Sequence, residues 1–184
     1  MTAIPSAISR ALARALPRFR IRGRELLPVV QGAMGVGISA HRLAGAVAGE
    51  GAMGTIASID LRHHHPDLME RCKNDPSHAT LEAANQTALS REIGAAKAVS
   101  EGHGMIAVNV MRAVASYAES VRTACESGAD AIVVGAGLPL DLPELTQGHD
   151  IALIPILSDS RGIALVLKIR RASRIVKKNQ RLLS

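Results

Sequence analysis

The sequence predicts an α/β protein that forms part of a TIM-type (β/α)8 barrel, with about five of the eight strand–helix units of a complete barrel. Short apolar segments rich in β-branched residues alternate with longer segments of helical periodicity. Small or polar residues follow each apolar segment, as they do at the carboxyl ends of barrel strands. The chain has 184 residues, whereas a complete barrel needs roughly 250. We therefore expect an incomplete barrel.

The N-terminal segment, residues 1–24, is expected to be a basic leader outside the barrel. It contains six arginines and no acidic residue. Apolar side chains recur at helical spacing over residues 6–16, which predicts a short helix that Pro17 ends. Residues 20–24 alternate and then turn, which indicates a small hairpin that leads into the barrel. The barrel itself is expected to occupy residues 25–168.

The first barrel unit begins with residues 27–30, whose apolar side chains predict a strand buried on both faces. This strand leads into a Gly-rich loop over residues 31–37. Ser39 is a good N-cap for a helix over residues 40–49. Residues 53–59 then predict the second strand. Small loop residues allow the backbone to approach a ligand closely, so the loop is a candidate binding element.

Residues 49–54 fit the pattern G-x-G-x-x-G, which occurs in dinucleotide-binding proteins. In that role the motif must follow a strand and open a helix. Here it follows a predicted helix and opens a predicted strand. We interpret it as the end of a helix followed by a tight turn.

Residues 60–78 are polar and irregular, and they include three adjacent histidines at positions 63–65. Adjacent side chains point in different directions, and no spaced Cys or carboxylate completes a recognised zinc pattern. We therefore expect this region to be a solvated loop or the start of a helix, and we expect no metal site.

The rest of the chain repeats the strand–helix pattern. Asn109 is the one polar residue in the strand predicted over residues 105–111. Its amide must find partners when it is buried. It is either a satisfied core residue or a ligand contact near the strand's carboxyl end, and we favour the ligand contact. The predicted elements are helices over residues 79–101, 113–127 and 160–167 and strands over residues 105–111, 129–134 and 151–157.

Charge and composition exclude several classes of partner. Residues 168–184 contain seven basic and no acidic residues, whereas the segment between the two basic ends has nine bases against sixteen acids. An acidic body argues against a basic binding face, and an aromatic content of 1% argues against base stacking. We expect no specific nucleic-acid partner. No apolar run reaches the length of about 20 residues that spans a bilayer, so we expect no membrane span.

Cysteine usage bears on the compartment. Cys72 and Cys125 are the only cysteines, and their spacing indicates neither a disulfide framework nor a metal site. Two reduced thiols fit a cytoplasmic protein, and the N-terminus lacks the apolar segment of a secretory signal.

Five segments, taken together and in this order, carry a family resemblance. They are Leu27–Gly35, Ser39–Ala48, Ala107–Val110, Asp130–Pro139 and Ile154–Ser158. This combination resembles the nitronate monooxygenases, formerly called 2-nitropropane dioxygenases, and the resemblance extends over about residues 20–168. The related flavin-dependent enoyl reductases share much of this pattern.

The resemblance implies an FMN-binding barrel that oxidises alkyl nitronates with O2. In that family the flavin ring lies over the loop after the first strand, and an Asn on the third strand and loops after later strands add contacts. Backbone N–H groups and an amide can bond the pyrimidine edge of a flavin, while a methionine packs on its ring. The matching positions are Gln31, Gly32, Ala33, Met34, Asn109, Gly135, Ala136 and Ser158.

The family's later motifs have no match in this sequence. Members continue into a strand with an Ala-Gly-Gly-His motif, whose His is the expected catalytic base, and into a Gly-Gly loop that holds the FMN phosphate. Residues 169–184 form instead a basic tail outside the family pattern. We therefore expect a truncated or frameshifted chain, assign no catalytic residue, and expect self-association through the open barrel edge. A related barrel reductase and a non-catalytic remnant with basic ends are the alternatives.

Overall fold

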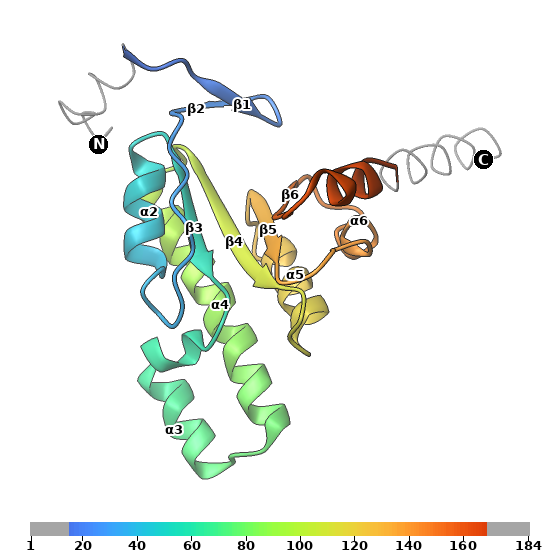
Figure 1. Cartoon of the computed structure of the whole chain (residues 1–184). Helices are drawn as coiled ribbons and strands as arrows, with labels where there is room; N and C mark the ends of the chain where they lie inside the picture. Colours follow the sequence, from blue (N-terminus) through green and yellow to red (C-terminus); the bar gives the residue numbers. More distant parts are fainter. Residues whose placement is uncertain (1–14, 169–184) are drawn as a thin grey trace, which may run out of the picture.

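A computed structural model of the chain describes residues 15–168 and has an α/β architecture (Figure 1). Its main sheet contains four parallel strands in the order β3-β4-β5-β6. These strands are β3 (Met53–Ala57), β4 (Met105–Met111), β5 (Ala131–Gly135) and β6 (Ala152–Pro155). The predicted α/β class is thus confirmed. The basic tail lies outside the described residues, as does almost all of the helix predicted over residues 6–16.

Helices alternate with the strands along the chain. The helical elements are α2 (His41–Gly49), η1 (Leu61–His64), α3 (Pro66–Asn74), α4 (His78–Ser100), α5 (Tyr117–Glu126) and α6 (Leu142–Leu145), and residues 160–168 are also helical. Helix α4 packs against α2 and α5 behind the sheet, while α3 extends beyond the end of the strands (Figure 1). Within residues 15–168, no helix is long and apolar enough to cross a membrane.

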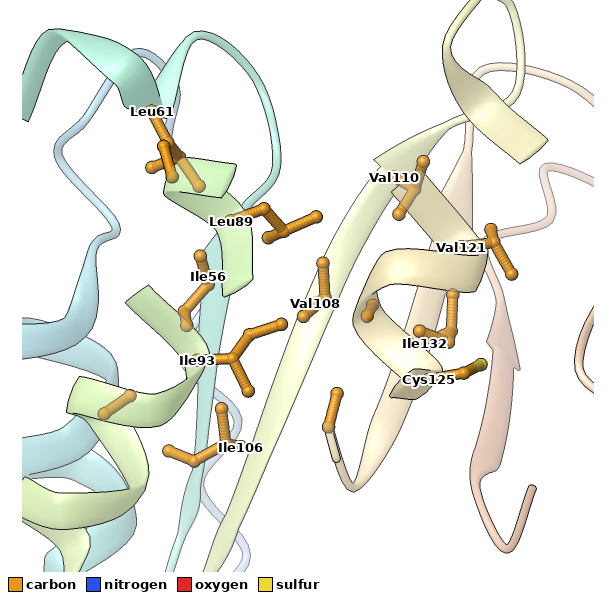
Figure 2. Packing of buried hydrophobic residues seen from close by; sticks show 14 of the residues in the cluster. Ile56, Leu61, Leu89, Ile93, Ile106, Val108, Val110, Val121, Cys125 and Ile132 are labelled. Atoms are coloured by element: carbon orange, nitrogen blue, oxygen red, sulfur yellow. The ribbon is translucent and has the colours of Figure 1, made fainter. Parts of the chain in front are cut away.

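The main core lies between the sheet and the helices α4 and α5. Alternate residues of a strand face the same side, so Ile106, Val108 and Val110 of β4 all point into this core. Figure 2 shows them between the side chains of α4 and those of α5. The other labelled contributors are Ile56, Leu61, Leu89, Ile93, Val121, Cys125 and Ile132. A single contiguous core therefore joins β3, β4 and β5 to their helices.

A small hairpin covers part of the opposite face of the sheet. It pairs β1 (Phe19–Ile21) with β2 (Arg24–Leu26) in antiparallel fashion, as the sequence predicted. Leu26 is 1% exposed and packs with Met53 and Met105, the first residues of β3 and β4. The hairpin therefore closes the amino ends of the strands (Figure 1).

Beyond the hairpin, the same face carries a row of side chains that we call the open face: Ala57, Asn109, Val133 and Ile154. The strand register places these four residues side by side across β3 to β6. None of the four belongs to the main core, and Val133 and Ile154 pack against the smaller cluster that contains Leu26 of the hairpin. The open face therefore faces away from the main core.

The first predicted strand is largely wrong. Residues 27–30 contribute only an isolated bridge between Val30 and Met53. Val29 and Val30 are 40% and 53% exposed, so this segment is not buried on both faces. The main sheet consequently has four strands rather than the five that the sequence predicted. The physical reason is that other groups accept the hydrogen bonds of the outer edge of β3, namely the side chain of Gln31 and the carbonyl of Ser39.

The N-cap of α2 needs correction: it is Ala40, which has no capping side chain, rather than Ser39. For residues 60–78 the second of the two alternatives, the start of a helix, is confirmed, because His65 is the N-cap of α3. The region is more regular than the sequence indicated, since it forms η1 and most of its second half is α3. Leu68 and Cys72 are buried one helical turn apart in α3, and the polar residues around them conceal this short apolar stripe.

The other predicted elements are confirmed with small shifts of their ends. Strand β4 has the predicted bounds, and α4 is displaced by one residue. Helix α5 begins four residues later than expected, and the loop after β5 contains the short α6. Helix α2 ends at Gly49 and β3 begins at Met53, which confirms that the G-x-G-x-x-G segment is a helix end and a turn.

Two Gly→Ala substitutions test the close contact between α2 and β3. A Cβ on Gly54 would lie 1.9 Å from the backbone oxygen of Ala44, so Gly54→Ala should lower the free energy of unfolding by about 3 kcal/mol or prevent folding. Gly94 lies on the exposed side of α4, where an added Cβ would meet no atom within 4 Å, so Gly94→Ala should add up to about 1 kcal/mol. Urea unfolding of both variants measures the difference, and similar stabilities would contradict this packing of α2 on β3.

Candidate functional site

The predicted site residues lie near the carboxyl ends of the strands. The loop of residues 31–39, which we call the ligand loop, runs beside β3, and Asn109 lies in the second half of β4. Gly135 ends β5 with Ala136 directly after it, and Ser158 comes after β6. In parallel α/β sheets, ligands bind at this end. The amino ends are closed by the hairpin (Figure 1).

The outer edge of β3 determines the path of the ligand loop. The N–H of Met53 donates to the carbonyl of Val29 over 3.1 Å, as in an ordinary ladder. The N–H of Thr55 instead donates to Oε1 of Gln31 over 2.8 Å. The N–H of Ala57 donates to the carbonyl oxygen of Ser39 over 3.0 Å. A side-chain amide and a distant carbonyl therefore replace the first strand along the second half of β3.

Ser39 connects the two ends of the ligand loop by hydrogen bonds. It is fully buried, and its Oγ accepts hydrogen bonds from the backbone N–H of Met34 and from Nε2 of Gln31, each over 2.9 Å. Its own N–H donates to the carbonyl oxygen of Met34 over 3.0 Å. Gln31 thus uses both ends of its amide to hold the loop against β3, which leaves its side chain little capacity for a ligand.

The tip of the loop has unused hydrogen-bonding groups. The backbone N–H groups of Gly32 and Ala33 donate to no acceptor among the described residues. The side chain of Met34 is 46% exposed, and a thioether adapts well to the face of an aromatic ring. This part of the loop can therefore offer two donors and one apolar surface to a planar ligand.

Asn109 lies beside the loop on the open face. It pairs in register with Ala57 on one side and Val133 on the other, and its backbone oxygen accepts from Ser58 over 3.1 Å. Its half-buried side-chain amide makes no hydrogen bond to any described residue. Such an amide has donors and an acceptor available for a ligand. The alternative that Asn109 is a core residue satisfied by a protein group does not hold within residues 15–168.

The two later predicted contacts lie farther along the sheet. A Cβ on Gly135 would lie 3.2 Å from Ile156, so glycine allows the loops after β5 and β6 to approach closely. Ala136 is exposed and has a left-handed φ of 57°. Because neighbouring strands are about 4.8 Å apart, Ser158 is separated from the ligand loop by nearly the full width of the sheet.

Ser158 lines a hollow of about 250 Å³ together with Leu138, Leu157 and Gly162. The helix of residues 160–168 begins there, and its first turn is already occupied. The N–H of Gly162 donates to Oδ1 of Asp159 over 2.7 Å. The structure therefore groups the ligand loop with Asn109 and places Ser158 in a separate hollow that contains a carboxylate.

A polar cluster behind the carboxyl ends was not predicted from the sequence. The Arg112 guanidinium lies 4.7 Å from the ring centroid of Tyr117 and 3.3 Å from the Asp141 carboxylate. The Tyr117 hydroxyl donates to Asp141 over 3.3 Å, and burial, together with the nearby Asp141 charge, raises the pKa of that hydroxyl. The cluster links the loops after β4 and β5. An Arg directly after a strand was its only sequence signal.

Comparisons with known proteins leave the family open. A scan against protein-family models finds no match to this chain, and a search of curated proteins finds no relative of it. Functional inference must therefore proceed from the geometry and chemistry of the residues themselves.

Replacing Ser39 tests whether its hydroxyl closes the ligand loop. Ser39→Ala removes the acceptor of two partly buried hydrogen bonds, from Met34 and from Gln31, which should lower the free energy of unfolding by about 1–3 kcal/mol. Ser90 lies exposed on α4, so Ser90→Ala is the matched control and should change stability by less than about 0.5 kcal/mol. Equal effects of the two substitutions in urea unfolding would contradict this role of Ser39.

Proposed function

We propose that the chain binds FMN at the carboxyl ends of its strands and that it is related by descent to the FMN-dependent nitronate monooxygenases. The observation that carries the proposal is the unpartnered amide of Asn109 on the open face. It lies across the register from β3, whose edge holds the ligand loop with its free N–H groups. A flavin pyrimidine edge alternates donors and acceptors, so it requires such a set.

The residues fit a flavin ring better than a whole FMN molecule. Asn109 would bond the pyrimidine edge, the N–H groups of Gly32 and Ala33 would add donors, and Met34 would pack on the ring. The phosphate finds no comparable cradle near Ser158, because Asp159 already caps that helix and the Arg161 side chain in the same hollow is paired with the Asp159 carboxylate. Bound flavin would supply the redox chemistry, and the protein residues orient the ring and shield one of its faces.

The reaction and the barrel architecture belong to the same proposal. The proposed activity is the oxidation of an alkyl nitronate with O2, and the four parallel strands would form part of the wall of an incomplete (β/α)8 barrel. The strand order β3-β4-β5-β6, with helices on one face only, supports a barrel wall. The edge of β6 would serve self-association. Cys72 and Cys125 are free and buried, which supports placing the protein in the cytoplasm.

Flavin binding by the purified chain tests the proposal. The protein incubated with FMN and then desalted should retain flavin absorbance, and quenching of flavin fluorescence should give a dissociation constant. Asn109→Leu removes the amide and should weaken binding about tenfold or more. Asn74→Leu, at the exposed end of α3, should leave binding unchanged.

Two results would contradict the proposal. A folded chain that retains no FMN under these conditions does not have the proposed site. Equal weakening by the substitutions at Asn109 and Asn74 would show that the effect is not local to the open face. Consumption of O2 on addition of an alkyl nitronate to the FMN-loaded protein tests the proposed reaction separately.

A further inference from the structure

Glu92 is a buried carboxylate that the proposed site does not use. Its side chain is 2% exposed, and it lies on the core side of α4 between Ala88 and Ala96, which are both fully buried. A carboxylate at such a position is costly unless hydrogen bonds and opposite charges compensate it. The contacts of Glu92 therefore indicate why it is tolerated there.

Both oxygens of Glu92 contact the elements that flank the ligand loop. Oε2 accepts a hydrogen bond from the backbone N–H of His41 over 2.7 Å and lies 2.7 Å from Nδ1 of the same residue. Oε1 lies 3.1 Å from Nε2 of His65. A side chain of α4 thus takes the place of the missing N-cap of α2, where it also complements the positive end of the helix dipole.

This contact determines where the ligand loop ends. His41 is the first residue of α2 and follows the loop after one residue, Ala40. On the other side, the imidazole of His64 packs so closely on Gly37 that a Cβ there would lie 2.1 Å from Nε2. Glu92 therefore holds α2 directly by a hydrogen bond, and its second oxygen lies close to His65 in the histidine segment that supports the loop from behind, without a hydrogen bond to it.

We propose that Glu92 is a positioning residue: from the helical side of the sheet, it fixes residues 31–39 in the conformation that presents Gly32 and Ala33 to a ligand. Without its carboxylate, Glu92 can no longer offer one oxygen to His41 and a second to His65, and in an amide an NH2 group replaces one of the two oxygens. The loop then exchanges between conformations. The consequence for FMN affinity rests on the proposed function, whereas the consequence for loop order does not.

Glu92→Gln tests this role, because it keeps the shape of the side chain and removes its charge. The control is Arg91→Ala, which breaks the exposed pair of Arg91 with Asp67, 2.9 Å apart, between the same helix and α3. Hydrogen exchange of the loop amides of Met34 and Ser39 should become about tenfold faster in Glu92→Gln, and FMN should bind about tenfold more weakly. Arg91→Ala should change neither quantity.

A second variant keeps the test decisive if Glu92→Gln fails to fold. His41→Gln retains the backbone N–H and alters only the imidazole contact, so it should accelerate exchange of the same amides to a smaller degree. Unchanged loop exchange in Glu92→Gln, or equal acceleration in Arg91→Ala, would overturn the positioning role. If the wild-type chain binds no FMN but Glu92→Gln accelerates loop exchange, the proposed function fails and the positioning role stands.

Discussion

The hydrogen bonds along the outer edge of β3 are the constraint on which the site depends. The edge of a sheet presents the N–H of every second residue without a partner from the ladder. Here Val29 satisfies the first, the side chain of Gln31 the second and the carbonyl of Ser39 the third. Because the amide of Gln31 replaces a strand residue, the backbone leaves the sheet at that point. The loop that results is closed by Ser39 and opens directly beside Asn109.

The sheet is covered unequally, and this explains where a ligand can bind. Helices α2, α4 and α5 bury one face over β3, β4 and β5, and the hairpin buries the amino ends of the other face. The row from Ala57 to Ile154 lies beyond the hairpin, at the end where the strand-following loops converge. Apolar side chains on both sides of a single amide give a surface suited to a flat, largely apolar ring with a polar edge.

Sequence patterns predicted the elements that local periodicity determines. Strand β4 and helix α4 have long, uninterrupted patterns, and their bounds were predicted to within one residue. The segment before Gln31 is equally apolar, but whether it becomes a strand depends on the hydrogen bonds of β3, which no local pattern contains. The cap of α2 was missed for the same reason, because Glu92 is 51 residues away in the sequence from His41. The only sequence signal for this cap was that the charged Glu92 falls at the helical spacing of the apolar residues of α4.

The two amides of the predicted site show what residue type alone leaves undecided. Gln31 and Asn109 have the same functional group and the same predicted role, yet the structure uses them differently. The amide of Gln31 bonds Thr55 and Ser39, whereas the side-chain amide of Asn109 makes no hydrogen bond to any described residue. Recognition at this site would then depend on Asn109 and the loop backbone, and Gln31 would act by holding that backbone in place. Glu92 contributes to the same end from the opposite side of the sheet, so the ligand loop is ordered by two polar side chains that never need to touch the ligand.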